Sequence, residues 1–522
     1  MKNLFNGKTA KVILFFVLLL VVCFTNLPFS GANNQSAIFA ASNGGSLKIA
    51  IIAGPTTFFM PKSRTTLDNQ ITMPALESLG RLNSKGSYEP WLAESFQVDP
   101  DHLTFTIKLR PNVFFHDGSK LTADVVKWNF EQIIKNGKAT EVGDPKSFDV
   151  VDPLTLVVHF DKWANNWPDV ISDIQIMSKE AYEKNGEAWC AVNLVGTGPF
   201  VMKKYIQGSQ VLYERFDKYR LKGLPRLNSL EIDIIPDLNT QITALQNKDT
   251  DCLMTNNGIA IQTLERAGFK NMGKQSPNLA DICYFLFNSK DPAVPFSKLK
   301  VRQAVMHSID YKNVAKVLTY GLGIATNQFG VPGAYSYNSK VKFYDYNIKR
   351  AKQLLKEAGY PNGFDTTIYT RAEIQDSAVP LQASLKAIGI NAAIKVLDAA
   401  LLDKMQVNES IPGIVMGKGA SQLDFTKNYI RLYSSEGIKN KGIIGFPPDY
   451  EKALFGARAA KTMAEKKALL QEASQMLVEK YCLLVPTAVA FYKCYTQDKV
   501  HDLGVYQVSI HAWTPEQVWV SK

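Results

Sequence analysis

The alternation of strand and helix patterns after about Lys298 is the feature that most restricts how this 522-residue chain can fold. A helical pattern over residues 348–358 stops at Gly359, a common way for a helix to end. A strand pattern over 365–369 follows, then a further helix, then a second strand over 393–397. Strand, helix and strand in this order predict an α/β lobe.

The first half of the chain mixes both patterns, and its length exceeds what one hydrophobic core usually organises. Thr122 can cap a helix whose apolar face includes Val126 and Phe130. After Pro486 the chain returns to a strand-like pattern. Strand patterns in the first half lie at residues 47–52, 103–109, 154–160 and 230–235. Two or more domains of mixed α/β character are therefore expected.

The N-terminus has the pattern of an export signal. Lysines at positions 2, 8 and 11 precede an apolar run over residues 12–22, which is 11 residues long and too short for a comfortable membrane span. Small residues suited to cleavage end at Ala32 and at Ala40. Cys23 follows Val22, whereas a lipidation box normally has a small residue before its cysteine, so lipidation at Cys23 is not favoured.

Five cysteines remain after Cys23, and no two are spaced as in a Cys-x-x-Cys motif. Export permits a disulfide, for which Cys482 and Cys494 are candidates. The favoured interpretation is that the cysteines are small buried apolar residues.

Charge and motifs argue against nucleic-acid binding and against catalysis. The net charge is +11, of which the first 40 residues contribute three lysines and no acid, and no dense basic run follows. Hydrolase, zincin and phosphate-loop motifs are absent, and the six histidines show no ligand-like spacing. The sequence therefore predicts a protein that is not an enzyme and that needs no cofactor or metal ion.

Several segments, in order along the chain, carry a family resemblance. They are Glu89-Pro-Trp91-Leu-Ala-Glu-Ser-Phe96; Leu109-Arg-Pro-Asn-Val-Phe-Phe-His116-Asp-Gly118 with Leu121-Thr-Ala-Asp-Val125; Val195-Gly-Thr-Gly-Pro-Phe200; Phe216-Asp-Lys-Tyr219 with Gly223-Leu-Pro-Arg226; and Val301-Arg-Gln-Ala304 with Ile309-Asp310. Together they resemble extracellular solute-binding protein family 5, which serves peptide-type and nickel-type ABC importers. Arg220 stands where that pattern usually has a tryptophan.

The resemblance implies a two-lobed periplasmic-binding-protein fold, with two hinge strands and an extra subdomain in the first lobe. The expected parts are a signal peptide over 1–40, the N-terminal lobe with its subdomain over 41–288, a second α/β lobe over 289–485, and a return to the first lobe over 486–522. The hinge strands are expected near 283–289 and 484–491. The family motifs are interpreted as structural: Arg110, His116, Asp117 and Asp124 would fix a strand–turn–helix corner, and Gly196 and Gly198 a tight turn.

Ligand contacts implied by the resemblance centre on the second lobe. Peptide-binding relatives hold the ligand's amine with an aspartate where this chain has Ser421, and Asp424 matches a later aspartate. Because a serine cannot neutralise an ammonium group, ordinary dipeptide capture is not expected. Further candidates are the cations Lys138, Arg371 and Lys418 and the apolar residues Phe58, Phe59 and Met60. A cleft with several cations would suit a carboxylate-bearing solute.

The sequence thus predicts an exported, monomeric receptor in the periplasm or on the outer face of the cytoplasmic membrane. It would capture an oligopeptide, dipeptide or metal chelate between its lobes and deliver it to ABC permease subunits. The alternatives are an exported sensory or adhesive binding protein and an exported hydrolase.

Overall fold

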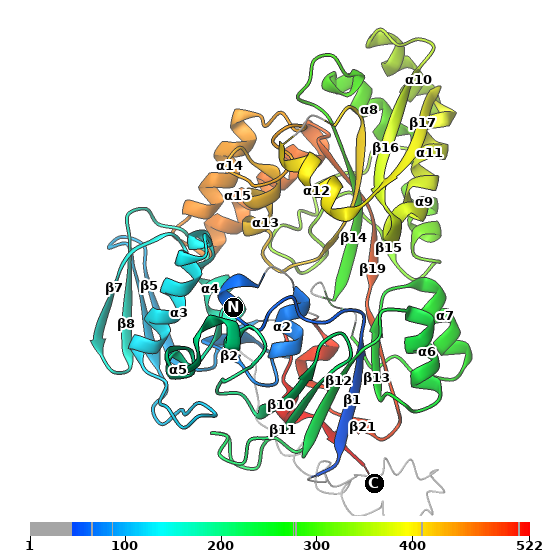
Figure 1. Ribbon diagram of the computed structural model, residues 1–522. Helices are drawn as coiled ribbons and strands as arrows, with labels where there is room; N and C mark the ends of the chain where they lie inside the picture. Colours follow the sequence, from blue (N-terminus) through cyan, green and yellow to red (C-terminus); the bar gives the residue numbers. More distant parts are fainter. Residues whose placement is uncertain are drawn as a thin grey trace, which may run out of the picture. The chain divides into compact units, whose positions relative to one another are not determined.

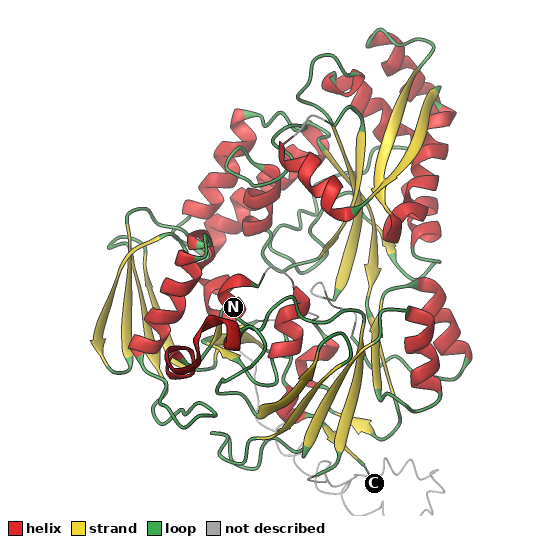
Figure 2. Ribbon diagram, in the orientation of Figure 1, coloured by secondary structure: helices red, strands yellow, loops and turns green. Residues whose placement is uncertain are grey.

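Two six-stranded sheets, each covered by helices, form the framework of the two lobes (Figures 1 and 2). The computed structural model describes residues 44–521 apart from 64–65, 86, 275, 277–278, 409–410 and 510–511. The predicted signal segment and Cys23 lie outside the described residues. None of the helices within the described part of the chain has the length and apolar character to cross a bilayer.

The first sheet has the strand order β10-β11-β12-β1-β13-β20. Its strands are β1 (Ser46–Ile51), β10 (Phe200–Ile206), β11 (Gln210–Arg215), β12 (Ser229–Ile234), β13 (Cys252–Thr255) and β20 (Lys493–Thr496). The central strand β1 pairs in parallel with β12 and β13, and the outer pairs are antiparallel. The predicted strands at 47–52 and 230–235 are confirmed as β1 and β12, and the structure shows that the two are neighbours in one sheet. Associated helices are α2 (Thr66–Thr72), α6 (Leu238–Gln246) and α7 (Gly258–Arg266).

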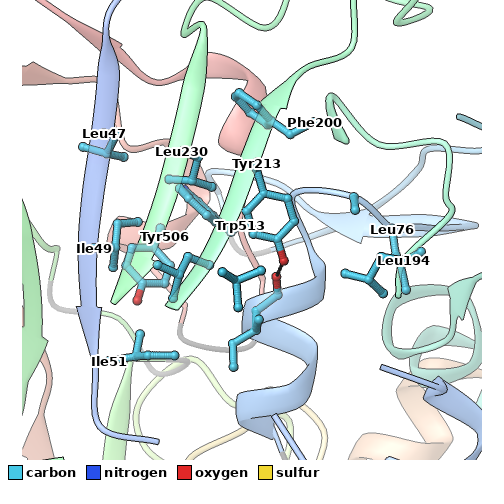
Figure 3. Packing of buried hydrophobic residues seen from close by; sticks show 14 of the residues in the cluster. Leu47, Ile49, Ile51, Leu76, Leu194, Phe200, Tyr213, Leu230, Tyr506 and Trp513 are labelled. Carbon is cyan, nitrogen blue, oxygen red and sulfur yellow. Dashed lines mark hydrogen bonds between the residues drawn. The ribbon is translucent and has the colours of Figure 1, made fainter. Parts of the chain in front are cut away.

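The core of the first lobe lies against this sheet (Figure 3). Leu47, Ile49 and Ile51 alternate along β1 and bury their side chains among residues of the C-terminal segment such as Tyr506. The hydroxyl of Tyr213 donates a hydrogen bond of 2.5 Å to the carbonyl of Ile71. The last residues of the chain thus complete the hydrophobic core of the first lobe.

A four-stranded antiparallel sheet forms a subdomain, with the strand order β5-β6-β8-β7. Its elements are β5 (Ala93–Asp99), β6 (Thr104–Leu109), α3 (Ala123–Lys135), β7 (Pro145–Asp152), β8 (Thr155–Phe160), α4 (Trp167–Asp173) and α5 (Lys179–Cys190). Thr122 caps α3 as predicted, because its hydroxyl accepts a hydrogen bond from the amide of Val125. Phe105, Phe130 and Leu156 belong to the separate core of this subdomain.

The family motifs join the subdomain to the first lobe. His116 Nε2 donates to the carbonyl of Gly198, His116 Nδ1 accepts from the amide of Gly196, and burial lowers the pKa of His116 to about 4. His116 is structural as predicted, but its ring holds the distant segment of Gly196 and Gly198 in addition to standing at the predicted corner. The glycines serve a different purpose from the predicted tight turn: a Cβ atom on Gly196 would lie 2.1 Å from the carbonyl oxygen of Ala75. Close backbone packing therefore requires glycine here.

The second sheet has the strand order β15-β19-β14-β18-β16-β17 and separates two helical layers. Its strands are β14 (Ala280–Phe287), β15 (Ile324–Ala325), β16 (Phe364–Arg371), β17 (Ile390–Leu397), β18 (Ile414–Ala420) and β19 (Leu484–Phe491). One face packs on α8 (Leu299–Ser308), α9 (Tyr311–Leu318), α10 (Ile348–Glu357) and α11 (Ala378–Ala387). The other packs on α12 (Ala399–Asn408), α13 (Thr426–Tyr433), α14 (Pro448–Ala459) and α15 (Met463–Gln475). The predicted α/β lobe is confirmed.

The chain enters the second sheet at β14 and leaves it after β19. β14 and β19 are paired along their length, from Ala280 opposite Phe491 to Leu286 opposite Leu484. Only Tyr492 separates β19 from β20 of the first sheet. The two segments expected to be hinge strands thus lie side by side in the second sheet.

The cysteines are buried thiols, as favoured from the sequence. Cys482 lies in the core of the second lobe, and its sulfur is 3.2 Å from the hydroxyl of Tyr344. Cys494 lies on β20, where its sulfur is 3.5 Å from that of Cys252. The candidate pairing of Cys482 with Cys494 is wrong, because the two residues belong to the cores of different lobes.

Candidate functional site

A cavity of about 550 Å³ lies where the first lobe, its subdomain and the second lobe meet. This volume falls within the range of about 300–1,000 Å³ that is usual for small-molecule sites. Wall residues include Met60, Met73, Leu76 and Glu77 of the first lobe, Lys138, Glu141, Asp144, Asp169 and Asp173 of the subdomain, Leu423, Asp424, Lys427, Ile430, Arg431 and Lys466 of the second lobe, and Trp513 and Glu516 near the C-terminus. The wall is mixed in character, with charged, apolar and aromatic side chains.

Asp169 places on the cavity wall a carboxylate that pairs with no described residue. It lies on α4, one helical turn before Asp173. No described residue donates a hydrogen bond to the Asp169 carboxylate, and the ion pairs near it are formed by Asp173 and Asp424 instead. Burial, with the nearby carboxylates of Asp173 and Asp424, raises the pKa of Asp169 to about 8, although the ammonium groups of Lys427 and Lys466 oppose the shift. The cavity therefore holds an acid that forms no ion pair with a described residue.

The second lobe presents two cations of α13 to this acidic helix. Lys427 and Arg431 are one helical turn apart and both line the cavity. The ammonium of Lys427 lies 3.8 Å from the carboxylate of Asp173, so α4 and α13 meet across the cavity. Arg431 is exposed and forms no ion pair with a described residue. An acid and a cation that pair with no described residue thus line the same cavity from opposite lobes.

A buried ion pair and a set of backbone contacts join the lobes beside the cavity. Lys466 lies 2.5 Å from Asp424, and each side chain is 1 % exposed. The Lys466 ammonium also donates to the carbonyl of Asn165 in the subdomain. The backbone amide of Asn165 donates a hydrogen bond of 2.6 Å to the carbonyl of Arg458. Its side-chain amide donates a second bond, of 3.0 Å, to the carbonyl of Ala460. The subdomain is therefore held against the α14–α15 connection.

A buried glutamate supports the first-lobe wall. Glu77 accepts hydrogen bonds from Trp91 at 2.7 Å, Thr197 at 2.8 Å and Tyr219 at 2.7 Å. Arg220, which replaces the usual tryptophan, stacks over Trp91 at 4.1 Å and lies 3.5 Å from Glu77. The exchange is compatible with the motif because a guanidinium group can stack on an aromatic ring and also pair with a carboxylate.

The structure brings three of the predicted site residues to the cavity. Met60, Lys138 and Asp424 line it. The Lys138 ammonium donates to the carbonyl of Ser63 in the first lobe. Asp424 is held by Lys466, so its charge is already compensated. Of these three side chains, only Met60 presents an uncommitted surface.

The other predicted residues do not line this cavity. Phe58 and Phe59 are fully buried in the first-lobe core, in the same cluster as Leu47 and Ile49 of β1. Ser421 is fully buried beside β14, where its amide bonds to Ala280. Arg371 pairs with Glu373 at 3.2 Å, and Lys418 pairs with Asp281 at 3.3 Å. Their role in ligand binding stays a prediction.

Sequence reasoning missed Asp169, Asp173, Lys427 and Trp513. The spacing of Asp169 and Asp173 by four residues, after Pro168 at a helix start, was a local signal that both face one side of a helix. No local pattern indicated that this face would meet the cavity, because the opposite wall comes from residues far along the chain.

Comparison with known proteins decides the family. Residues 87–440 match the model of the bacterial extracellular solute-binding proteins, family 5. The chain belongs to this family. Heme-binding protein A of Haemophilus influenzae is 27% identical over 449 residues, which cover 77% of this chain and 80% of the relative. The glutathione-binding protein GsiB of Salmonella paratyphi A is 29% identical over 387 residues, with 71% and 73% covered.

Solved structures agree on the fold. The periplasmic binding protein DppA from Helicobacter pylori, in complex with the peptide STSA, superposes with a TM-score of 0.79 at 24% identity. The match covers 92% of this chain and 99% of that protein. The predicted two-lobed periplasmic-binding-protein fold is confirmed. As a family 5 solute-binding protein, the chain is the substrate-binding receptor of an ABC importer.

Proposed function

We propose that this receptor captures a peptide-like solute whose ammonium group pairs with Asp169. The observation that carries the proposal is the partnerless carboxylate of Asp169 on the wall of the cavity. A carboxylate without a partner in a partly buried site is unfavourable, and a ligand ammonium would supply the missing charge. The expected amine-binding aspartate of the second lobe is replaced by Ser421, so the amine site would move to the subdomain.

Arg431 is the proposed partner for a carboxylate of the same solute. It lines the cavity from α13, one helical turn after Lys427, and is not in an ion pair with any described residue. A guanidinium group binds carboxylates with two parallel hydrogen bonds. The apolar wall residues Met60, Leu423 and Trp513 would contact side chains of the solute. A short zwitterionic peptide, including a modified peptide such as glutathione, meets these requirements.

The proposed setting is the outside of the cytoplasmic membrane. The lysines and the apolar run before residue 23 support export through a signal peptide, and the family is extracellular. Delivery of the solute to permease subunits, in the periplasm or at the outer face of the cytoplasmic membrane, completes the proposed role. Binding is proposed to occur without turnover, so bound solutes should be recovered chemically unchanged.

The test begins with mass spectrometry of small molecules released from protein purified from its native host. Calorimetry then compares tripeptides and tetrapeptides, their N-acetylated forms, glutathione, heme and a nickel–histidine complex. Free-amine peptides are expected to bind more tightly than their acetylated forms. A preference for heme or for the nickel complex over every free-amine compound would refute the proposal.

Asp169→Asn isolates the proposed contact. A charge-assisted hydrogen bond contributes about 1.5–3 kcal/mol, and 1.4 kcal/mol corresponds to about tenfold in affinity, so a loss of about 10- to 100-fold is expected. In this variant, free and acetylated peptides should bind alike. Asp249→Asn, an exposed aspartate of the first lobe, is the matched control. Equal affinity in the wild type and Asp169→Asn would show that the amine does not bind there.

A further inference from the structure

The surplus positive charge of the chain is concentrated in one segment of the second lobe. Residues 298–360 hold eleven lysines and arginines and three acids, a net charge of +8. The whole chain has a net charge of +11, and the first 40 residues contribute +3 of it. Outside the first 40 residues and this segment, positive and negative residues are therefore equal in number. The remaining positive charge belongs to this segment alone.

Eight of the eleven cations of this segment lie on the helices of one layer or directly before them. Their helices α8, α9 and α10 pack through a shared core onto one face of the second sheet. We define the basic face as Lys298, Lys300, Lys312, Lys316, Lys349, Arg350, Lys352 and Lys356. All of these are exposed except Arg350, which is partly exposed. Lys300 and Arg350 share one acid, Glu357, at 2.9 and 3.4 Å.

The basic face points away from the solute cavity. The cavity is lined by α13 and α15, which pack on the opposite face of the same sheet. Neighbouring strand residues show this separation, since Val415 belongs to the core on the cavity side and Ile414 to the core beneath the basic face. Figure 1 shows α13–α15 and α9–α11 on opposite sides of β14 and β16. A partner on the basic face would leave the solute site unobstructed.

Exposed aromatic side chains accompany these cations. Phe343 is 47% exposed and packs edge-on against Tyr311 at the start of α9, and Tyr346 is 58% exposed just before α10. Both lie between Lys342 and Lys349 in the sequence. Aromatic rings among lysines are typical of surfaces that rest at the headgroup level of a membrane.

We propose that the basic face docks this receptor on an anionic phospholipid surface. Seven of its eight cations are lysines, which act as mobile point charges and suit a fluid array of phosphate groups. A specific acidic protein surface would favour arginine forks in fixed geometry. Each lysine near an anionic membrane strengthens attachment severalfold, and the aromatic rings add an apolar contact. Docking would keep the loaded receptor at the membrane that holds its importer.

The test is flotation of the full-length protein with vesicles. Vesicles of phosphatidylcholine alone are compared with vesicles of equimolar phosphatidylcholine and phosphatidylglycerol. Binding is expected only to the anionic vesicles, and it should disappear in about 1 M salt, where the Debye length falls to about 3 Å. Lys349→Gln/Lys352→Gln/Lys356→Gln should weaken binding by roughly 100-fold.

A matched control removes the same charge elsewhere. Lys218, Lys222 and Lys270 are exposed lysines of the first lobe, and their triple substitution to glutamine should leave vesicle binding unchanged. All variants keep the same N-terminal segment, and unchanged calorimetric solute binding verifies folding. Tyr346→Ser should weaken vesicle binding by a few fold without changing its salt dependence. Equal losses in the two triple variants, equal binding to both vesicle types, or tighter binding to polyglutamate than to anionic vesicles would overturn the proposal.

Discussion

Replacing Lys466 with methionine tests the energetics of the contact between the lobes. Lys466 and Asp424 are each 1 % exposed and lie 2.5 Å apart, so removal of the ammonium leaves a buried carboxylate without its counter-charge. The carbonyl of Asn165 also loses its donor. Breaking a buried pair from one side costs about 3–5 kcal/mol. Lys466→Met should therefore lower the free energy of unfolding by about that amount.

Urea unfolding followed by tryptophan fluorescence measures this effect, provided that the slope with denaturant is unchanged. Asp424→Asn/Lys466→Met removes both charges and keeps an oxygen that can accept from the amide of Thr426. Most of the lost stability should return in this double variant, because replacing both members of a buried ion pair with uncharged residues often changes the free energy of unfolding little. Lys467→Met, an exposed neighbour on α15, should change stability by less than about 0.5 kcal/mol. A loss below about 1 kcal/mol in Lys466→Met, or no recovery in the double variant, would refute the reasoning.

Three further predictions concern the cavity acid, the lobe contact and the packed glycine. The pKa of Asp169 is about 8 in the folded protein and near 3.8 when unfolded. Its contribution to the stability of the solute-free protein is therefore present below about pH 4 and lost as the pH rises through about 8. The melting temperatures of the wild type and Asp169→Asn should diverge across this pH range, and a parallel pH dependence would contradict the shift. Since an ammonium ligand requires ionised Asp169, affinity for free-amine peptides should rise as the pH approaches 8, with proton release measurable in buffers of different ionisation enthalpy. Asn165→Ala removes the 3.0 Å bond to Ala460 and should lower solute affinity severalfold by weakening the contact between the lobes, as calorimetry can measure; an unchanged affinity would exclude this coupling. Gly196→Ala places a carbon 2.1 Å from the Ala75 carbonyl and should destabilise the protein by more than about 2 kcal/mol in urea, whereas Gly208→Ala at an open turn should cost less.

Local features of the fold could be predicted because they depend on residues close in sequence. Thr122 and Asp310 cap helices through the amides three residues ahead, and Gly359 follows the end of α10 in a left-handed conformation. The alternation of strands and helices after Lys298 likewise identified the second lobe. The family motifs established the architecture because several short segments occurred together in one order.

Residue partnerships that span the chain were decided only by the tertiary structure. Lys466 meets the carbonyl of Asn165 across 301 positions, and Cys494 lies beside Cys252 rather than Cys482. Asp169 faces a cavity whose other walls come from α13 and the C-terminal segment. A carboxylate has the same local sequence whether it is solvated, paired or left without a counter-charge. The physical reason is that burial and charge compensation depend on which distant surfaces meet, and short-range periodicity carries no information about that meeting.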